Sequence, residues 1–451
     1  MMVIKMTKCY RVLFQTYDKS KPNETLTEES VLESDITTST NCLDFSIGMS
    51  KQLKLIKDIQ SNILQEKVNL LSDKKVSSQC PKCDKNLSKG GKQTSTFHDV
   101  FTDHSVIFQR FRCRSCGYEL PCTVKQTLGT IQSGELQKIQ SEIGATHTYR
   151  ESQQLLTLFS SEERYINNHD RIKHVSESVG ESLEQIHKEE KRIAGTKEAK
   201  ELVLNVDGGH IQTNEKDKRS MEAMTSVIYQ PDSIIKNKKD TRNYLASKNC
   251  AASVSDDSQE QIICSTILAA LKQGMGASTE VTALCDGAKN CWNVVEAIKP
   301  LCGSIICILD WFHLAMKVEN ISLPAKLKER LLKVKWYLWR GDVTSAITRL
   351  KKLIDDSKNE THIERLKKFS NYITNNAARI VNYSERKDAG LVFTSNLAES
   401  TVESLINRRC KGQQHMRWSR NGLNPLLQIR AAMHSKGEWE DKWQTAVLNA
   451  A

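Results

Sequence analysis

Three acidic side chains in the second half of the chain are spaced so that they could act together on a phosphodiester. Asp207 follows the apolar run ELVLNV and Asp286 follows EVTALC, and each aspartate is followed by glycine. A single Asp-Gly pair after a strand is typical of a turn. A third acid, Glu399 or Glu403, lies in the helical stretch LAESTVESLINRRC. Three carboxylates at one sheet edge could hold two Mg²⁺ (or Mn²⁺) ions, which is the arrangement used for in-line phosphoryl displacement.

The elements expected around these acids form a mixed sheet. ELVLNVDGGHI and MEAMTSVIY predict a β-hairpin, NCAASVS predicts a less certain third strand, and EVTALC and SIICIL predict two more. Helices are expected between the later strands, over QEQIICSTILAALKQGM and NVVEAIKP. This order predicts an α/β fold with helices packed on a mixed sheet. In such a sheet the strands before Asp207 and Asp286 can be neighbours, which would bring both carboxylates to one edge.

Periodicity does not decide between the two glutamates. Both flank the apolar stripe of their helix, formed by Ala398, Val402, Leu405 and Ile406. Like charges four residues apart repel mildly, so neither is explained by helix stability. Asn396 could cap this helix with Glu399 as its capping-box partner, which would make Glu399 structural.

An Asp-x-x-His pair, Asp310 and His313, follows the last expected strand in ILDWFH. Asp310 competes with Asp286 for the role of second catalytic acid, and Asp286 is preferred because it ends the fourth strand. His313 could orient a phosphate or a water molecule, or it could be an ordinary histidine at a helix start. Both residues are therefore expected to be accessory to the acidic site.

Four cysteines predict a metal site in the first half of the chain. Cys80 and Cys83 form one C-x-x-C pair, and Cys113 and Cys116 form a second. Four thiolates on two tight turns make the closed tetrahedral shell that structural Zn²⁺ accepts. The stretch VFTDHSVIFQRFR between the pairs is strand-like, which predicts a zinc ribbon.

The composition fits a soluble protein with a polyanionic partner. The 451 residues carry 65 Lys and Arg against 54 Asp and Glu, a net charge of +11. Such a balance favours nucleic acid, because phosphate contacts release condensed counterions. The sequence contains no long apolar run and no convincing secretory signal, so we expect no membrane contact and a cytoplasmic, nucleoid-associated location. Four basic residues near the last acid could contact phosphates: Arg408, Arg409, Lys411 and Arg417.

Changes in composition predict six segments. The first two are a variable, partly helical N-terminal region and the zinc ribbon, and a helical region that could resemble a helix-turn-helix follows them. The catalytic sheet is expected in two parts, on either side of a Lys-rich all-helical insertion. The expected boundaries are 1–75, 76–125, 126–198, 199–313, 314–388 and 389–451.

Several of these stretches resemble one family when they are taken together. TSNLAES followed by INRRCKGQQHMRWS resembles the C-terminal signature of insertion-sequence transposases of the ISKra type, which are more distantly related to Mutator-like transposases. CDGAKNCW and ILDWFH are similar to two further blocks of that family. The paired cysteines and GATHTYRESQQLL match its N-terminal half. The resemblance covers roughly residues 76 to 440.

The resemblance implies an RNase H-like core with a DDE triad, which maps onto Asp207, Asp286 and Glu399. It implies a bacterial enzyme that binds the terminal inverted repeats of an insertion sequence and catalyses metal-dependent DNA cleavage and strand transfer. Two Mg²⁺ ions, a structural Zn²⁺, double-stranded DNA of the element ends and target, and a homo-oligomer on DNA would belong to it. Two other functions remain open. One is a zinc-ribbon DNA-binding protein with an inactive nuclease domain, and the other is a Mg²⁺-dependent nuclease or resolvase without strand transfer.

Overall fold

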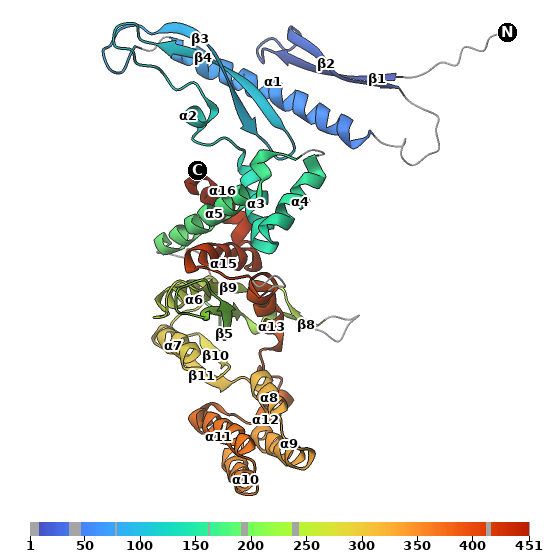
Figure 1. Cartoon of the computed structure of the whole chain (residues 1–451), viewed down its shortest axis with the longest axis vertical. Helices are drawn as coiled ribbons and strands as arrows, with labels where there is room; N and C mark the ends of the chain where they lie inside the picture. The colour runs from blue at the N-terminus through green and yellow to red at the C-terminus, as the bar shows by residue number, and fades with distance from the viewer. Residues whose placement is uncertain are drawn as a thin grey trace, which may run out of the picture. The chain divides into compact units, whose positions relative to one another are not determined.

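The computed structural model describes residues 9–35, 47–76, 79–160, 163–190, 197–236, 243–411 and 416–450. Within these ranges the chain forms two compact units, mainly Met1–Ser176 and mainly Glu177–Ala446, and each is described by itself (Figure 1). None of the helices in the described ranges is long and apolar enough to cross a membrane.

The first unit contains two antiparallel hairpins and several helices. One hairpin pairs β1 (Cys9–Tyr17) with β2 (Thr25–Asp35), and the other pairs β3 (Ser88–His98) with β4 (Asp103–Arg112). The helices are α1 (Met49–Val76), α2 (Val124–Leu128), α3 (Gly134–Thr146), α4 (Tyr149–Ser160) and the first part of α5 (His169–Glu189). A 3₁₀ turn, Tyr165–Asn167, lies between α4 and α5.

The β1–β2 hairpin was not predicted, because the sequence indicated only partial helix over residues 1–75. Strand β2 is mostly polar and exposed, whereas β1, CYRVLFQTY, has Val12 and Phe14 half-buried in alternation with exposed residues, a pattern that the prediction missed. The reversal between them begins with an Asx turn, in which the Asp18 carboxylate accepts a hydrogen bond from the backbone N–H of Ser20 at 2.8 Å. The partial helix expected within residues 1–75 corresponds to α1.

The second unit is built on a five-stranded mixed sheet with strand order β11-β10-β5-β6-β9. The strands are β5 (Glu201–Gln212), β6 (Ser220–Tyr229), β9 (Asn249–Ser253), β10 (Glu280–Cys285) and β11 (Ser304–Leu309). Strands β5, β10 and β11 are parallel, whereas β6 and β9 are antiparallel. The predicted mixed sheet and its chain order are confirmed, including the less certain strand β9. A short pair, β7 (Ile234–Lys236) and β8 (Asn243–Leu245), was not expected.

Helices cover both faces of this sheet. On one face α6 (Glu260–Lys272) and α7 (Lys289–Ile298) enclose an apolar core with alternate residues of β5, Leu202, Leu204 and Val206. Alternation along the strand turns Val203, Asn205 and Asp207 to the opposite face. At the edge of the sheet, α15 (Arg420–His434) runs along the free side of β9, where the Gln428 amide donates a hydrogen bond to the Ala252 carbonyl oxygen at 3.0 Å (Figure 1).

Between β11 and the C-terminal segment, where a helical insertion was expected, the chain forms a set of helices. It comprises α8 (Trp311–Asn320), α9 (Ala325–Trp339), α10 (Val343–Asp355), α11 (Glu360–Asn375) and α12 (Tyr383–Asp388). Trp311, Trp339, Tyr383 and Phe393 form an aromatic cluster at its base. The Tyr383 hydroxyl donates a hydrogen bond to the Leu309 carbonyl oxygen at 2.7 Å, which ties this cluster to the end of β11.

The chain returns to the sheet through α13 (Asn396–Val402). A π-helical turn, Glu403–Asn407, and the short α14 (Arg408–Cys410) continue it, and α16 (Glu438–Ala450) follows α15. Single π-turns inside helices are rare and are frequent at functional sites. Residues 412–415, which belong to the basic signature, lie outside the described ranges.

Candidate functional sites: a carboxylate–histidine cluster and a cysteine cluster

Three aspartates follow three neighbouring parallel strands at the same level of the sheet. Cys285, the last residue of β10, pairs with Val206 of β5 on one side and with Leu309 of β11 on the other. Asp207, Asp286 and Asp310 are the next residues of the three strands. The prediction that the strands before Asp207 and Asp286 are neighbours is therefore confirmed. Asp207 does not end its strand, however, because β5 continues to Gln212 in its antiparallel pairing with β6.

A small cavity gathers these residues together with the start of α13. It has a volume of about 10 Å³, roughly the space for one water molecule. Its polar lining includes Asn205, Asp207, Asp286, Asp310, His313, Ser395 and Glu399. All the acids singled out from the sequence except Glu403 thus border one cavity, although they come from segments up to about 190 residues apart.

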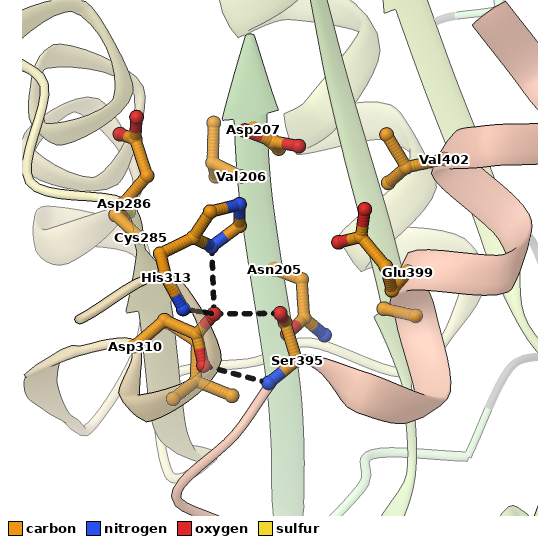
Figure 2. A pocket seen from close by; sticks show the side chains of 12 residues that line it. Asn205, Val206, Asp207, Cys285, Asp286, Asp310, His313, Ser395, Glu399 and Val402 are labelled. Carbon is orange, nitrogen blue, oxygen red and sulfur yellow. Dashed lines mark hydrogen bonds and ion pairs between the residues drawn. The ribbon is translucent and has the colours of Figure 1, made fainter. Parts of the chain in front are cut away.

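The side chains that line the cavity do not all point toward one another. Ligand atoms of Asp207, His313 and Glu399 all lie within 4.8 Å of one another. Figure 2 shows the Glu399 carboxylate of α13 facing the Asp207 side of the cavity, with the His313 ring pointing toward them. In the same view the Asp286 carboxylate lies on the other side of the His313 ring from Glu399. Asp286 accepts a hydrogen bond from the backbone N–H of Ala288 at 2.9 Å, which fixes it at the start of α7.

Gly287 and Tyr372 fix the backbone beside Asp286. Gly287 has a φ of +94°, and a Cβ there would lie 2.8 Å from the Tyr372 ring, so only glycine fits. The Tyr372 hydroxyl donates a hydrogen bond to the Asp286 carbonyl oxygen at 2.7 Å. The glycine after Asp286 is therefore required by a close contact with the helical insertion and by its backbone conformation.

Asp310 borders the cavity, but hydrogen bonds already occupy its carboxylate oxygens. Its side chain is 1% exposed, and its oxygens accept hydrogen bonds from the Ser395 backbone N–H at 2.8 Å and the Ser395 hydroxyl at 2.7 Å. One oxygen also lies 2.7 Å from Nδ1 of His313. As the N-cap of α8, Asp310 accepts from the N–H groups of Phe312 and His313 as well. It joins the starts of α8 and α13, the helices that carry His313 and Glu399.

The start of α13 differs from the capping arrangement considered from the sequence. Ser395, not Asn396, is the N-cap residue, and its hydroxyl is used on Asp310 rather than on a helix N–H. The Glu399 side chain lines the cavity instead of returning to the helix start. Glu403, one turn later, is exposed and accepts a hydrogen bond from the Asn407 amide. Geometry thus separates two glutamates that periodicity leaves equivalent.

Burial and like charge disturb ionisation in this cluster. Burial raises the pKa of Asp207, and Asp286 and Asp310 raise it further against the opposing effect of His313. Burial also raises the pKa of Glu399, with Asp207 adding to it. For His313, burial would lower the pKa, but the Asp310 hydrogen bond and the attraction of Asp207 and Glu399 raise it to about 9. Positive charge is therefore favoured at the point that faces both carboxylates.

The donor set fits a divalent cation. Carboxylate oxygens are the ligands that Mg²⁺ and Mn²⁺ prefer, and imidazole nitrogen suits the transition metals. Asn205, which is 4% exposed and lies two residues before Asp207 on the same face of β5, also lines the cavity. Its amide atoms have no hydrogen-bond partner of normal geometry in the described chain. The sequence reasoning missed Asn205 and Ser395, although the two-residue strand period could have indicated Asn205.

The four predicted basic contacts are placed differently. Arg409 is 3% exposed, with its guanidinium 4.9 Å from the centre of the Trp418 ring, so it packs inside the protein. Arg408 and Arg417 are exposed. The Lys411 ammonium lies over Gly209, two residues beyond Asp207, since a Cβ on that glycine would be 2.9 Å from Nζ. Lys411 thus lies beside the strand that carries Asp207.

The four predicted cysteine ligands meet at the base of the β3–β4 hairpin. Cys80 and Cys116 have sulfurs 3.4 Å apart, as have Cys83 and Cys113, and all four sulfurs lie within 4.8 Å of one another. Zn–S bonds of about 2.3 Å in a tetrahedron would place the sulfurs about 3.8 Å apart, so the cluster is compatible with structural zinc. The cluster lies within the first unit.

The two cysteine turns have the same backbone shape. In one, the Cys80 N–H donates to the Lys85 carbonyl oxygen at 2.9 Å, and in the other the Cys113 N–H donates to the Tyr118 carbonyl oxygen at 2.8 Å. Each turn needs a left-handed residue four positions after its first cysteine, at Asp84 (φ 55°) and Gly117 (φ 73°). Cys122 is outside the cluster and donates to the Gln93 amide oxygen at 3.2 Å.

Comparison with known proteins gives a family but no named relative. No curated protein matches the chain. A family model described as an uncharacterised protein family matches residues 134–445, more than half of the chain, including all the residues of the carboxylate–histidine cluster. The protein is therefore a member of the uncharacterised protein family UPF0236.

Proposed function

We propose that this protein is a DDE transposase of the ISKra type, with an RNase H-like catalytic core and a zinc ribbon. The observation that carries the proposal is the meeting of Asp207, Asp286 and Glu399 around one cavity at the C-terminal edge of the parallel strands. The mixed sheet, its helical insertion before the glutamate helix and the cysteine cluster support it. A catalytic role for Asp310 is less favoured, since its oxygens are occupied by Ser395 and His313.

The chemistry is DNA hydrolysis followed by transesterification, with no covalent enzyme intermediate. Divalent cations held by the three acids would activate the attacking water or 3′-hydroxyl and stabilise the leaving oxygen. The protein's part is to fix the carboxylates. Asp207 is held by its strand, and Glu399 is held through the Asp310–Ser395 hydrogen bonds. Lys411, near the strand of Asp207, supplies positive charge for a phosphate.

A basic cavity in the helical insertion supports DNA as the partner. The cavity has a volume of about 70 Å³, and four cations line it: Arg330 and Lys333 of α9, and Arg349 and Lys352 of α10. No acidic side chain lines it. Arg349 is supported from one side by the Tyr337 ring, 4.6 Å from its guanidinium. Converging cations in a concave surface suit the phosphates of a duplex.

Two of the cavity cations also pair with acids at its rim, Arg330 with Asp356 at 2.6 Å and Lys333 with Glu329 at 3.0 Å. Other cations of α9 hold the helices of the insertion together. The Lys328 ammonium donates to the carbonyl oxygens of Val318 and Ile321 at the end of α8, at 2.8 and 3.1 Å. Lys335 pairs with Glu319 at 3.0 Å. The Lys-rich helix therefore contains both residues that hold the insertion together and residues that face the basic cavity.

Replacement of Glu399 tests the catalytic proposal. The Glu399→Gln variant should lose strand cleavage by more than about 100-fold. Replacing a residue that only hydrogen-bonds to a metal ligand already lowers metal affinity or activity 10- to 100-fold. Glu403→Gln, in the next turn and exposed, is the matched control and should cleave normally. Full cleavage by Glu399→Gln would instead favour a DNA-binding protein whose carboxylates are inactive.

A strand-transfer assay separates a transposase from a simple nuclease. The protein is incubated with pre-cut element ends, a target plasmid and Mg²⁺ or Mn²⁺. Joined products are expected from a transposase, because the free 3′-hydroxyl attacks the target phosphodiester. Cleavage without joined products would identify a metal-dependent nuclease or resolvase.

Paired charge reversals test the DNA contact. Lys333→Glu with Lys352→Glu changes two cations of the basic cavity, and Lys326→Glu with Lys351→Glu makes the same charge change at exposed positions of the same helices. The first double variant should bind a duplex about tenfold more weakly, with a salt slope lower by about 2, one for each lost phosphate contact. Equal effects of the two doubles would mean that net charge alone is responsible.

A further inference from the structure

We infer that His313 is a direct ligand of a divalent cation held together with Asp207 and Glu399, so that this ion has a nitrogen ligand as well as oxygens. The inference deepens the proposed function, on which it depends for the presence of a divalent cation. The three ligand atoms lie within 4.8 Å of one another, close enough for one ion to contact all of them.

The ring nitrogens of His313 have different surroundings. Nδ1 lies 2.7 Å from the Asp310 carboxylate, which accepts a hydrogen bond from it. Figure 2 shows the other nitrogen, Nε2, turned toward Asp207. In a neutral ring the Asp310 hydrogen bond therefore places the proton on Nδ1 and leaves the Nε2 lone pair facing the two carboxylates.

Asp310 holds His313 in the way that carboxylates commonly hold metal-binding histidines. Histidines that bind metals usually donate their second N–H to a carboxylate, which fixes the tautomer and the ring orientation. Asp310 is itself fixed by two donors from Ser395 and by the N-terminus of α8. The chain thus holds the imidazole in one orientation before any ion arrives.

Asp286 is turned away from this set. Its carboxylate accepts from the Ala288 N–H and lies across the His313 ring from Glu399 (Figure 2). The first ligand shell of this ion therefore comprises Asp207, His313 and Glu399, and the buried Asn205 amide lines the same cavity. Asp286 remains available for a second ion.

The nitrogen ligand predicts which ions bind. Mg²⁺ strongly prefers oxygen ligands, whereas Mn²⁺ accepts both carboxylate and imidazole. We therefore expect this position to favour Mn²⁺ over Mg²⁺. In a second group of the described chain, His187, Glu190 and Glu438, the ligand atoms also lie within 4.8 Å of one another. Lys272 and Lys442 already provide positive charge there, since both ammonium groups pair with Glu190 and Glu438.

Electron spin-echo envelope modulation of bound Mn²⁺ tests the ligand directly. Zinc-loaded full-length protein is titrated with Mn²⁺, and modulation from a directly coordinated ¹⁴N is expected. His313→Gln should remove that modulation and weaken Mn²⁺ binding by at least about tenfold. His187→Gln is the control for the second histidine and should leave both measurements unchanged.

Three results would overturn the assignment. The first is Mn²⁺ binding without ¹⁴N modulation in the unaltered protein, and the second is modulation that persists in His313→Gln. The third is the absence of Mn²⁺ binding at millimolar concentration. The measurement needs no DNA and no turnover, so the Glu399→Gln cleavage assay tests the proposed function separately. The unaltered protein alone gives a decisive spectrum if His313→Gln fails to fold.

Discussion

The cysteine cluster and the carboxylate–histidine cluster are built in opposite ways. The cysteines come from two short turns at the base of one hairpin, and each turn is closed by its own backbone hydrogen bonds. Asp207, His313 and Glu399 come from a strand, an insertion helix and a returning helix, and Asp310 and Ser395 hold these parts together. The first arrangement puts four ligands on short-range structure. The second makes its geometry depend on hydrogen bonds between residues that are far apart in the chain.

The difference predicts where substitution affects folding most. A cysteine cluster of this type contributes folding energy through its metal, about 10–16 kcal/mol in small zinc domains. Cys113→Ser should therefore release the metal and unfold the hairpin of the first unit. Zinc content and calorimetry measure both effects. Cys122→Ser changes a buried cysteine after the same hairpin, outside the cluster, and is the control. Retention of zinc and of the melting profile in Cys113→Ser would show that the cluster is not a structural metal site.

How much of each cluster the sequence predicts depends on how far apart in the chain its contacts lie. Spacing alone identifies all four cysteines, because each C-x-x-C turn is complete within six residues. The apolar runs identify β5, β10 and β11, and hence the level at which Asp207, Asp286 and Asp310 lie. Whether an acid turns into the cavity depends on partners distant in the chain. Asp310 is bound to Ser395, 85 residues later, and the backbone at Asp286 is fixed by the Tyr372 hydroxyl, 86 residues later.

Other features escaped prediction because their local signals are weak. Strand β1, CYRVLFQTY, is rich in apolar and aromatic residues, but its partner β2 is mostly polar and resembles an irregular segment. The π-turn after α13 leaves no pattern in the composition. Arg409 reads as a surface cation in a basic run, yet it is buried against Trp418, because the helix orientation and not its charge decides its environment.

The next largest effect is expected at the residue that joins the parts of the carboxylate–histidine cluster. Asp310→Asn keeps the size of the side chain but replaces an acceptor by an NH₂ donor that faces Ser395 and His313. Removing charged hydrogen bonds from a side chain that is 1% exposed should cost about 1.5–3 kcal/mol in the free energy of unfolding. Denaturant unfolding measures this cost.

A positioning role predicts more than lost stability. In Asp310→Asn the affinity for Mn²⁺ should fall about 10- to 100-fold, because His313 loses the carboxylate that orients its ring. Ser395→Ala removes one donor and leaves the His313 contact in place, so its loss of Mn²⁺ affinity should be smaller. Equal losses in both variants would contradict an effect transmitted through His313.

A smaller effect is expected from an ion pair at the other end of the β3–β4 hairpin. Arg164, whose side chain is 2% exposed, contacts the Asp103 carboxylate and the carbonyl oxygens of Val100 and Thr102 around the hairpin turn. Burial would raise the pKa of Asp103, but hydrogen bonds from His98 and Arg164 outweigh it and lower the pKa to about 2. Because Asp103 is 37% exposed, solvent screening limits its contribution to roughly 1 kcal/mol.

The pH dependence follows from that lowered pKa. Folded protein binds fewer protons at Asp103 than unfolded protein does, so the contribution is complete above the unfolded pKa of 3.8 and is lost as the pH falls through about 2. Asp103→Asn should therefore be less stable than the unaltered protein at pH 7, and the difference should shrink between pH 4 and pH 2. A difference independent of pH would assign the loss to packing.

The smallest effect on folding is expected where the effect on activity is largest. Glu399 is a half-buried carboxylate whose pKa is raised by burial and by Asp207, so its ionised form is disfavoured in the folded protein. Glu399→Gln removes that charge and keeps the shape, and we expect a free energy of unfolding within about 0.5 kcal/mol of the unaltered value, or slightly above it. Denaturant unfolding at pH 7 without divalent cations measures it. A clear loss of stability would mean that Glu399 supports the fold, and the contrast with the cysteine cluster would then disappear.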